Sequence, residues 1–293
     1  MAKKSVSLVL GSGGARGLAH IGVIHWLEEH DYVISSISGC SVGALVGGIY
    51  AAGKLDEFEH WVRAITKIDI FNLLDLSWKS SGLVKGDRII NTLTKLVGDI
   101  AIEDLSINYT AVAADIKNEK EVWMNSGRLF DAIRASISLP LFFTPYNHNG
   151  IQLIDGGVLN PVPIAPTFGD TTDITIAVNL GASTEPCTSL KPHQVDVKQD
   201  QADLTFSSKI KVFIKSFKST STYSMSEKWG AYDIANQAFD AMQSTISRQK
   251  LAAYPPDITI EISRNACGTL EFDRADEMIA LGYQLCEKEF NKK

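Results

Sequence analysis

The sequence predicts an α/β fold, a three-layer α/β/α sandwich around a mostly parallel central sheet. Two observations carry this prediction. Over the first 53 residues, short apolar runs alternate with helix-like stretches, and glycine-rich turns separate them. Such alternation is typical of a parallel sheet covered by helices. In addition, 45% of the 293 residues are hydrophobic and 21% are charged, which is ordinary for a globular protein with a sizeable core.

The first part of the chain contains two strand–turn–helix units. Residues 6–10 form an apolar run that ends at a glycine, which is typical of a buried strand, and residues 18–30 carry apolar side chains at helical spacing. Residues 32–37 predict a second strand, and the small, apolar residues 44–52 predict a buried helix. This order favours a largely parallel sheet.

The remainder of the chain is less regular. Its patterns predict helices at 56–67, 86–97, 129–137 and 273–290, and strands at 108–114, 120–124, 152–154, 173–180 and 257–262. Residues 181–226 are rich in Ser, Thr, Lys and Gln, so we expect them to form a less regular excursion from the fold. Because no linker-like stretch divides the chain, we expect residues 1–293 to form a single domain.

Charge and cysteine content narrow the class of protein. The net charge of −6 matches nucleic acid poorly, so no nucleic-acid partner is expected. The four cysteines lack C-x-x-C and zinc-ligand spacing, so we expect reduced thiols and neither a metal nor another cofactor. The apolar run after the basic N-terminus is too short for a convincing signal peptide, and none is long enough to span a membrane. We therefore expect a cytoplasmic protein.

The segment Gly39-Cys40-Ser41-Val42-Gly43 has the pattern G-x-S-x-G between a predicted strand and a predicted helix. A sharp turn there exposes the serine above the sheet, and the flanking glycines remove Cβ atoms that would clash. The N-terminus of the following helix helps to stabilise an oxyanion. Ser41 is therefore the candidate nucleophile, and the alternative is a tight structural turn.

The candidate base for this serine is Asp155 rather than a histidine. Only His148 and His193 follow Ser41 outside strongly patterned helices. His148 lies just before Asp155, the wrong order for an α/β-hydrolase triad, and His193 lies in the irregular excursion. Asp155 ends a predicted strand, and two glycines follow it, so it can accept the serine proton directly. The alternative is an ordinary β-turn, in which Asp-Gly is common.

The glycine-rich turn GSGGARG at residues 11–17 narrowly fails the dinucleotide-binding fingerprint. Counted from Gly11, the last glycine of G-x-G-x-x-G is replaced by Arg16. A glycine turn that caps a helix still directs free N–H groups at an anion. We expect that anion to be the oxyanion of an acyl-transfer intermediate. Gly13 and Gly14 are the candidate donors, and Arg16 either adds positive charge or fixes the loop.

Taken in order, these motifs resemble those of the patatin-like phospholipase family. The family pattern is a G-G-x-R-G turn, a G-x-S-x-G elbow, an A-S-x-x-x-P segment and a D-G-G motif. In this sequence these are residues 13–17, 39–43, 135–140 and 155–157. The motif glycines outside the candidate donors are Gly11, Gly17, Gly39, Gly43, Gly156 and Gly157.

The resemblance implies a patatin-like sandwich with a Ser–Asp dyad that acts without histidine. Ser41 is then the nucleophile, Asp155 the base, and the N–H groups of Gly13 and Gly14 the oxyanion hole. The implied function is a serine lipid acyl hydrolase, of the phospholipase A or lysophospholipase type, that works through an acyl-enzyme. The alternatives are a catalytically silent adaptor or membrane-binding protein, and an acyltransferase with the same acyl-enzyme.

Two segments bear on a lipid or lysophospholipid substrate. Residues 139–146 (LPLFFTPY) either line an acyl pocket or pack in the core. Residues 208–219 (SKIKVFIKSFKS) combine four lysines with an apolar helical face, which is typical of a segment that rests on anionic lipid. The alternative is an ordinary surface helix. The sequence thus leaves open a peripheral contact with the inner membrane face, and it leaves the oligomeric state unknown.

Overall fold

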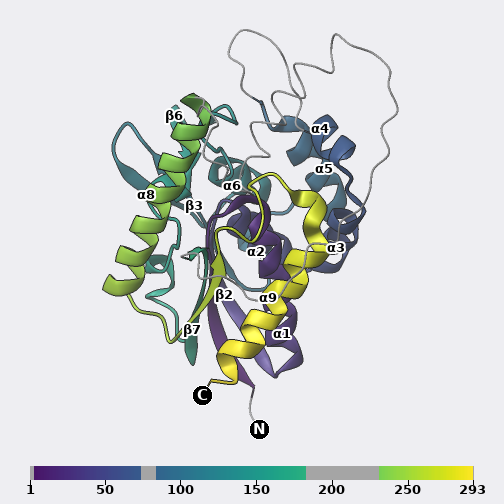
Figure 1. The fold of residues 1–293 in the computed structure, drawn as a ribbon, viewed down its shortest axis with the longest axis vertical. Coiled ribbons are helices and arrows are strands. Elements are labelled where there is room, and N and C mark those ends of the chain that lie inside the picture. Colours follow the sequence, from purple (N-terminus) through teal and green to yellow (C-terminus); the bar gives the residue numbers. More distant parts are fainter. Residues whose placement is uncertain (1–2, 74–83, 183–230, 293) are drawn as a thin grey trace, which may run out of the picture.

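A computed structural model describes residues 3–73, 84–182 and 231–292 of the chain. Helices cover both faces of an eight-stranded mixed sheet, as the sequence predicted for an α/β sandwich (Figure 1). The strands are β1 (Lys4–Leu10), β2 (Tyr32–Cys40), β3 (Asn108–Asp115), β4 (Lys120–Met124), β5 (Tyr146–His148), β6 (Ile151–Asp155), β7 (Ile174–Ala182) and β8 (Ile258–Ser263). The helices are α1 (Ala19–Glu29), α2 (Val42–Ala51), α3 (Leu55–Ala64), α4 (Lys67–Leu73), α5 (Asp87–Val97), α6 (Leu129–Ser136), α8 (Ala231–Ala253) and α9 (Ala275–Phe290).

The strand order is β5-β6-β3-β2-β1-β7-β8, with β4 also paired to β3. Strands β3, β2, β1, β7 and β8 are parallel, whereas β4 and β6 are antiparallel to β3, and β5 is antiparallel to β6. Helices α1, α2 and α9 lie on one side of the sheet and α8 on the other (Figure 1). The parallel region was predicted, and the antiparallel end makes the sheet mixed.

Helices α1 and α9 pack closely because each has a glycine where the other approaches. A Cβ on Gly22 would lie 1.9 Å from the carbonyl oxygen of Ile279, and a Cβ on Gly282 would lie 1.9 Å from that of Ala19. This contact joins the C-terminal helix to the first strand–helix unit, so residues far apart in the sequence share one core.

The register of the strands brings the ends of β1, β2 and β6 together. The last residue of β1, Leu10, is paired with Gly39 of β2, so the two parallel strands end at the same edge. Cys40 of β2 is paired with Val112 of β3, and Asp155 of β6 is paired with Ala113. Strand β2 runs parallel to β3 and β6 runs antiparallel to it, so the two strands approach from opposite directions. Their last residues therefore pair with neighbouring residues of β3. The segments after β1 and β2 therefore lie beside the end of β6.

The predicted elements are present, with different limits. Strand β2 continues to Cys40, beyond the predicted end at residue 37. The sequence predicted no strand at residues Tyr146–His148, which form β5 and pair with β6. So short a strand has little pattern of its own and depends on this pairing. Helices α4 and α8 were not predicted.

Several predictions lie outside the described residues. They include residues 183–226 of the irregular excursion predicted at 181–226, and the whole of the basic apolar segment 208–219. The single-domain prediction stays a prediction. In the described ranges, none of the helices has both the length and the apolar character needed to cross a membrane.

Candidate active site

Ser41 occupies a strained turn between β2 and α2. Its backbone has φ of 56° and ψ of −125°, a left-handed conformation that is unusual for a residue with a side chain. The turn is also tight, because a Cβ on Gly43 would lie 2.1 Å from the carbonyl oxygen of Leu10. The N–H of Ser41 donates to the Ser136 hydroxyl at 2.9 Å. The sequence motif and its strand–turn–helix context therefore form the expected sharp elbow.

Asp155 is fully buried at the end of β6. Its Oδ1 accepts hydrogen bonds from the N–H of Gly157 at 2.8 Å and from the Cys40 thiol at 3.8 Å. Its Oδ2 has no hydrogen-bond partner in the described part of the chain. Burial raises the pKa of Asp155 to about 6, while the nearby Ser41 hydroxyl and the hydrogen bonds from Gly157 and Cys40 lower it. Among the described residues, no hydrogen bond joins the Ser41 hydroxyl to the Asp155 carboxyl.

The glycine turn leaves two backbone donors free beside this pair. The N–H groups of Ser12 and Ala15 donate to carbonyl oxygens elsewhere in the fold at 2.8 and 2.9 Å. Across the described ranges, no acceptor is bonded to the N–H of Gly13 or Gly14. Gly14 has φ of +59°, and a Cβ there would lie 2.4 Å from the carbonyl oxygen of Thr269, so this position requires glycine. Two free donors in one turn fit an anion site.

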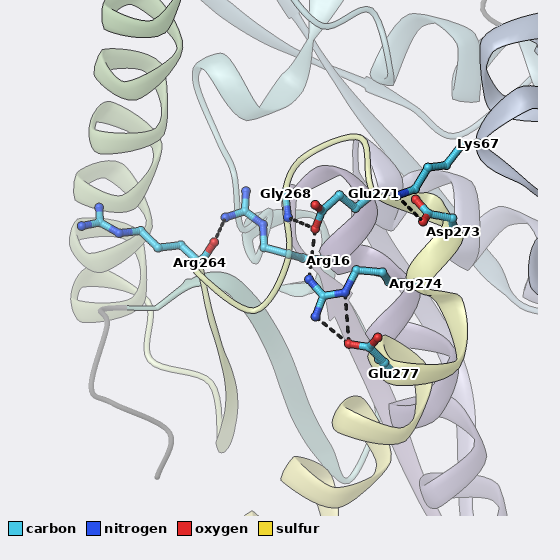
Figure 2. A network of polar contacts seen from close by, with 8 residues as sticks. All are labelled: Arg16, Lys67, Arg264, Gly268, Glu271, Asp273, Arg274 and Glu277. Carbon is cyan, nitrogen blue, oxygen red and sulfur yellow. Dashed lines mark hydrogen bonds and ion pairs between the residues drawn. The ribbon is translucent and has the colours of Figure 1, made fainter. Parts of the chain in front are cut away.

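Arg16 is buried and holds the turn rather than entering the space in front of it. Its Nε donates to the carbonyl of Gly13 at 2.9 Å. Its Nη1 donates to the carbonyl of Arg264 at 2.7 Å, as Figure 2 shows. Its Nη2 lies 4.0 Å from a carboxylate oxygen of Asp240 on α8. Burial lowers the pKa of Arg16 from its ordinary value. Of the two roles expected for Arg16, these contacts favour fixing the loop.

The loop between β8 and α9 completes this part of the site. The carbonyl of Thr269 accepts the N–H of Ala15, and Leu270 lines the cavity beside Ser41. The Glu271 carboxylate fastens the loop by accepting the N–H of Gly268 at 2.9 Å and a guanidinium N–H of Arg274 at 3.0 Å (Figure 2). The sequence analysis missed this loop, because no local motif marks its approach to a turn more than 250 positions earlier.

An apolar cavity of about 110 Å³ borders Ser41 and Gly14. Its walls come from α2, α3, α4, α5, the segment after α6 and the loop before α9. The lining side chains are mostly aliphatic or aromatic and include Val42, Leu45, Phe58, Trp61, Val62, Ile65, Ile70, Leu73, Ile89, Leu93, Ile137, Leu139, Phe142 and Phe143. Of the predicted segment 139–146, three residues therefore line the cavity, and one of them, Phe142, is also buried in the core.

Close packing explains why the predicted motif positions are glycines. At each of them, an added Cβ would come within 2.7 Å of another non-hydrogen atom of the protein. These positions are Gly11, Gly17, Gly39, Gly43, Gly156 and Gly157. The glycine turn, the elbow and the D-G-G turn thus sit against their neighbours with no room for side chains.

His20 supports the glycine turn through a hydrogen bond but forms none with Ser41. His20 is fully buried on α1, and its Nε2 lies 2.9 Å from the carbonyl oxygen of Gly11. Burial lowers the pKa of His20 to about 4, so the ring is neutral at pH 7 and Nε2–H donates to that oxygen. Within the described residues no histidine forms a hydrogen bond with Ser41, and His193 lies outside them.

Comparison with known proteins identifies the family. The family model described as "Patatin-like phospholipase" matches residues 8–168, more than half of the chain and the part that holds both Ser41 and Asp155. The chain belongs to the patatin-like phospholipase family.

Relatives and a solved structure agree with this family. The chain is 38% identical to an uncharacterized NTE family protein of Mycobacterium tuberculosis, over 96% of this chain and 89% of that protein. It is 31% identical to lysophospholipase NTE1 of Saccharomyces cerevisiae, over 61% of this chain but 11% of that much longer protein. The crystal structure of VipD from Legionella pneumophila superposes with a TM-score of 0.56 at 15% identity, over 99% of this chain and 67% of that chain, and supports the fold alone.

Proposed function

We propose that this protein is a serine lipid acyl hydrolase of the phospholipase A or lysophospholipase type. The observation that carries the proposal is that Ser41 lines an apolar cavity while its neighbour Cys40 contacts the buried carboxyl of Asp155, beside the two free N–H groups of the glycine turn. A nucleophile, a base, an anion site and an apolar binding space are the parts that lipid ester hydrolysis needs.

In the proposed reaction, Ser41 Oγ attacks the ester carbonyl carbon while Asp155 accepts its proton. The carbonyl oxygen becomes an oxyanion that accepts hydrogen bonds from the N–H groups of Gly13 and Gly14. When the intermediate collapses, the C–O bond to the alcohol breaks and Asp155 returns the proton to that alcohol. Water then attacks the carbonyl carbon of the acyl-enzyme while Asp155 accepts its proton. The bond between that carbon and Ser41 Oγ breaks, Asp155 returns the proton to Oγ, and the fatty acid leaves.

Burial suits Asp155 for this role. An ordinary aspartate, with a pKa near 4, is a weak base for a serine hydroxyl. Burial raises the pKa of Asp155 to about 6, nearer to the working pH, while the group still ionises at neutral pH. The Gly157 N–H and the Cys40 thiol hold the carboxyl in place through Oδ1, which leaves Oδ2 available to the serine.

The names of relatives favour a lysophospholipid as substrate. The Saccharomyces and Eremothecium proteins called lysophospholipase NTE1 share 31% and 32% identity with 61% of this chain. Since the chain spans only 11% and 12% of those proteins, their substrate is transferred here as a proposal. A cytoplasmic location with peripheral contact at the inner membrane face through residues 208–219, and a single domain over residues 1–293, remain predictions.

The test compares hydrolysis by three purified variants. Ser41→Ala and Asp155→Asn should each lower the rate of lysophospholipid and p-nitrophenyl ester hydrolysis by about 10⁴-fold, because each removes a reacting group. Ser7→Ala is the control, since Ser7 is fully buried, as Asp155 is, but bonds Asp170 and Thr172 instead of groups of the candidate site. Unchanged hydrolysis by either site variant would falsify the dyad.

Two further measurements on the same protein distinguish the alternative functions. A fluorophosphonate probe that labels wild-type protein but not Ser41→Ala excludes a catalytically silent adaptor, and failure to label the wild type supports one. Product analysis with an added alcohol acceptor distinguishes a hydrolase, which releases free fatty acid, from an acyltransferase, which forms a new ester.

A further inference from the structure

The end of helix α6 contacts the backbone of both proposed catalytic residues. The hydroxyl of Ser136, the last residue of α6, accepts the N–H of Ser41 at 2.9 Å. Two residues later, the carbonyl of Ser138 accepts the N–H of Asp155 at 2.9 Å. This is the A-S-x-x-x-P segment that the sequence shares with its family, and the proposed reaction assigns it no part. The acceptor of the Ser41 N–H and the acceptor of the Asp155 N–H thus lie on one short stretch of backbone.

The Ser136 hydroxyl has a fixed orientation because both of its roles are used. Its proton goes to the carbonyl oxygen of Val112 at 2.6 Å, so a lone pair points at the Ser41 N–H. Val112 is the residue of β3 that pairs with Cys40, the neighbour of the nucleophile. Ser136 is fully buried, and water therefore cannot replace it without rearrangement of the packing. One hydroxyl thus joins α6, β3 and the elbow.

Ser41 has a conformation that needs such support. A residue with a side chain at positive φ stores strain of about 1–3 kcal/mol and persists only where its surroundings enforce it. The N–H of Ser41 precedes the first helical residue of α2, so no carbonyl of that helix accepts it. If this N–H lost its acceptor, the peptide could relax and turn the Ser41 side chain away from the cavity and Asp155.

We propose that Ser136 is a positioning residue for the nucleophile. Its hydroxyl holds the Ser41 peptide in the strained conformation that directs Oγ toward the ester carbon and the base. The kinetic consequence rests on the proposed hydrolase function, whereas the backbone contact does not.

The kinetic test uses two pairs of variants that differ by a hydroxyl. Ser136→Ala is compared with the wild type, and Ser136→Val with Ser136→Thr, which has nearly the same shape. For a soluble p-nitrophenyl ester we expect kcat to fall by about 10- to 100-fold in the Ala and Val variants, with KM within about twofold. Ser136→Thr should recover most of the loss. Ser7→Ala, another buried serine with two hydrogen bonds, should retain wild-type kcat.

A merely structural role for Ser136 has a different outcome. The Ala variant would then lose thermal stability as Ser7→Ala does and keep kcat within about twofold of the control, and the proposal would be overturned. Equal activity of the Thr and Val variants would overturn it as well. If neither β-branched variant folds, the comparison of Ala with wild type and with Ser7→Ala decides.

A second readout needs no enzymatic activity. Hydrogen–deuterium exchange of the peptide that contains residues 38–45 reports the protection of the Ser41 N–H. We expect that amide to exchange at least about tenfold faster in Ser136→Ala than in Ser7→Ala, and equal exchange would overturn the proposal. A wild type that hydrolyses no ester would instead contradict the proposed function and leave this readout valid. The two failures are therefore distinguishable.

Discussion

The glycine turn borders two cavities of opposite character. On the substrate side, Gly14 and Ser41 border the apolar cavity. A second, smaller cavity borders Ser12 and Arg16, and its other lining residues are largely polar or charged: Asp240, Gln243, Ser244, Ser247 and Arg264. The buried guanidinium and its carboxylate neighbour support the turn, whereas the space in front of Ser41 contains no charged side chain among the residues that line it. The difference shows how one loop combines a charged support on one side with an apolar cavity on the other. In the proposed reaction, such an apolar space strengthens the action of free N–H dipoles on an oxyanion.

After the two proposed dyad residues, the largest effect on activity is expected from Gly14→Ala, which disturbs the turn on the side of the apolar cavity. An added Cβ would lie 2.4 Å from the Thr269 carbonyl oxygen at a φ of +59°, so the turn must move. Displacing an oxyanion donor should lower kcat by about 10²- to 10³-fold. Gly53→Ala is the matched control, because Gly53 has a φ of +67° but nothing within 4 Å of an added Cβ. Equal kcat values for the two variants would exclude Gly14 as a donor.

Arg16→Met removes the support on the polar side and should have the next largest effect. The carbonyls of Gly13 and Arg264 lose their donors, so we expect kcat to fall by about 10- to 100-fold and the free energy of unfolding by about 2–3 kcal/mol. Arg16→Lys should not restore activity, because one ammonium group cannot reproduce the two-pronged contact. Denaturant unfolding and ester kinetics measure both effects.

The control for this substitution is an exposed arginine. Arg128→Met breaks a surface ion pair with Asp99 and should leave both stability and kcat close to those of the wild type. If Arg16→Met behaves like Arg128→Met, the polar side does not support the turn.

The pH dependence should report the buried base. Because the proposed base Asp155 acts in its ionised form and its pKa is raised to about 6, kcat/KM should fall about tenfold per pH unit below 6 and reach a plateau above it. A soluble p-nitrophenyl ester gives this profile without interference from lipid phases. An apparent pKa near 4 would show that burial does not control the base.

The same shift has a consequence for stability with a definite sign. The folded protein holds the Asp155 proton more tightly than the unfolded chain, so ionisation of Asp155 lowers stability as the pH rises from about 4 to about 6. The loss is about 3 kcal/mol for a shift of about two units. Asp155→Asn should therefore gain stability relative to wild type over this range, as measured by denaturant unfolding at pH 4 and pH 7.5. A constant difference would contradict the raised pKa.

The smallest effect on activity is expected inside the apolar cavity. Leu93→Ala removes a fully buried side chain from the wall, which should cost about 2–5 kcal/mol of stability and shift ester preference toward longer acyl chains by a few fold, about 1 kcal/mol. Leu27→Ala truncates an equally buried leucine that does not line the cavity. It should lose similar stability with unchanged chain-length preference. A parallel shift in both variants would mean that the cavity does not hold the acyl chain.

Much of the fold could be predicted from local patterns. The strands β1, β3 and β7 and the helices α5 and α9 have apolar periodicity or runs strong enough to locate them. Strand β5 and helices α4 and α8 escaped prediction because their stability comes from neighbouring elements rather than from their own pattern. The candidate site divides in the same way: local motifs mark Ser41, Asp155 and the glycine turn, whereas the contacts of Ser136 with Ser41 and of Thr269 with Ala15 join segments distant in the sequence.

By itself, the sequence determined the family and the α/β class and marked the candidate site residues, because turns that need glycine and buried strands restrict residue types locally. Only the tertiary structure decided how those candidates meet. The register of β2 and β6 on β3 brings the turn that holds Ser41 to the end of β6, where Asp155 lies, and burial then raises the pKa of Asp155. The direction of the Arg16 side chain and the apolar wall in front of Ser41 also depend on segments distant in the chain. The reason is physical: burial, hydrogen-bond partners and electrostatic fields are sums over neighbours in space, and the local pattern of a sequence does not contain them.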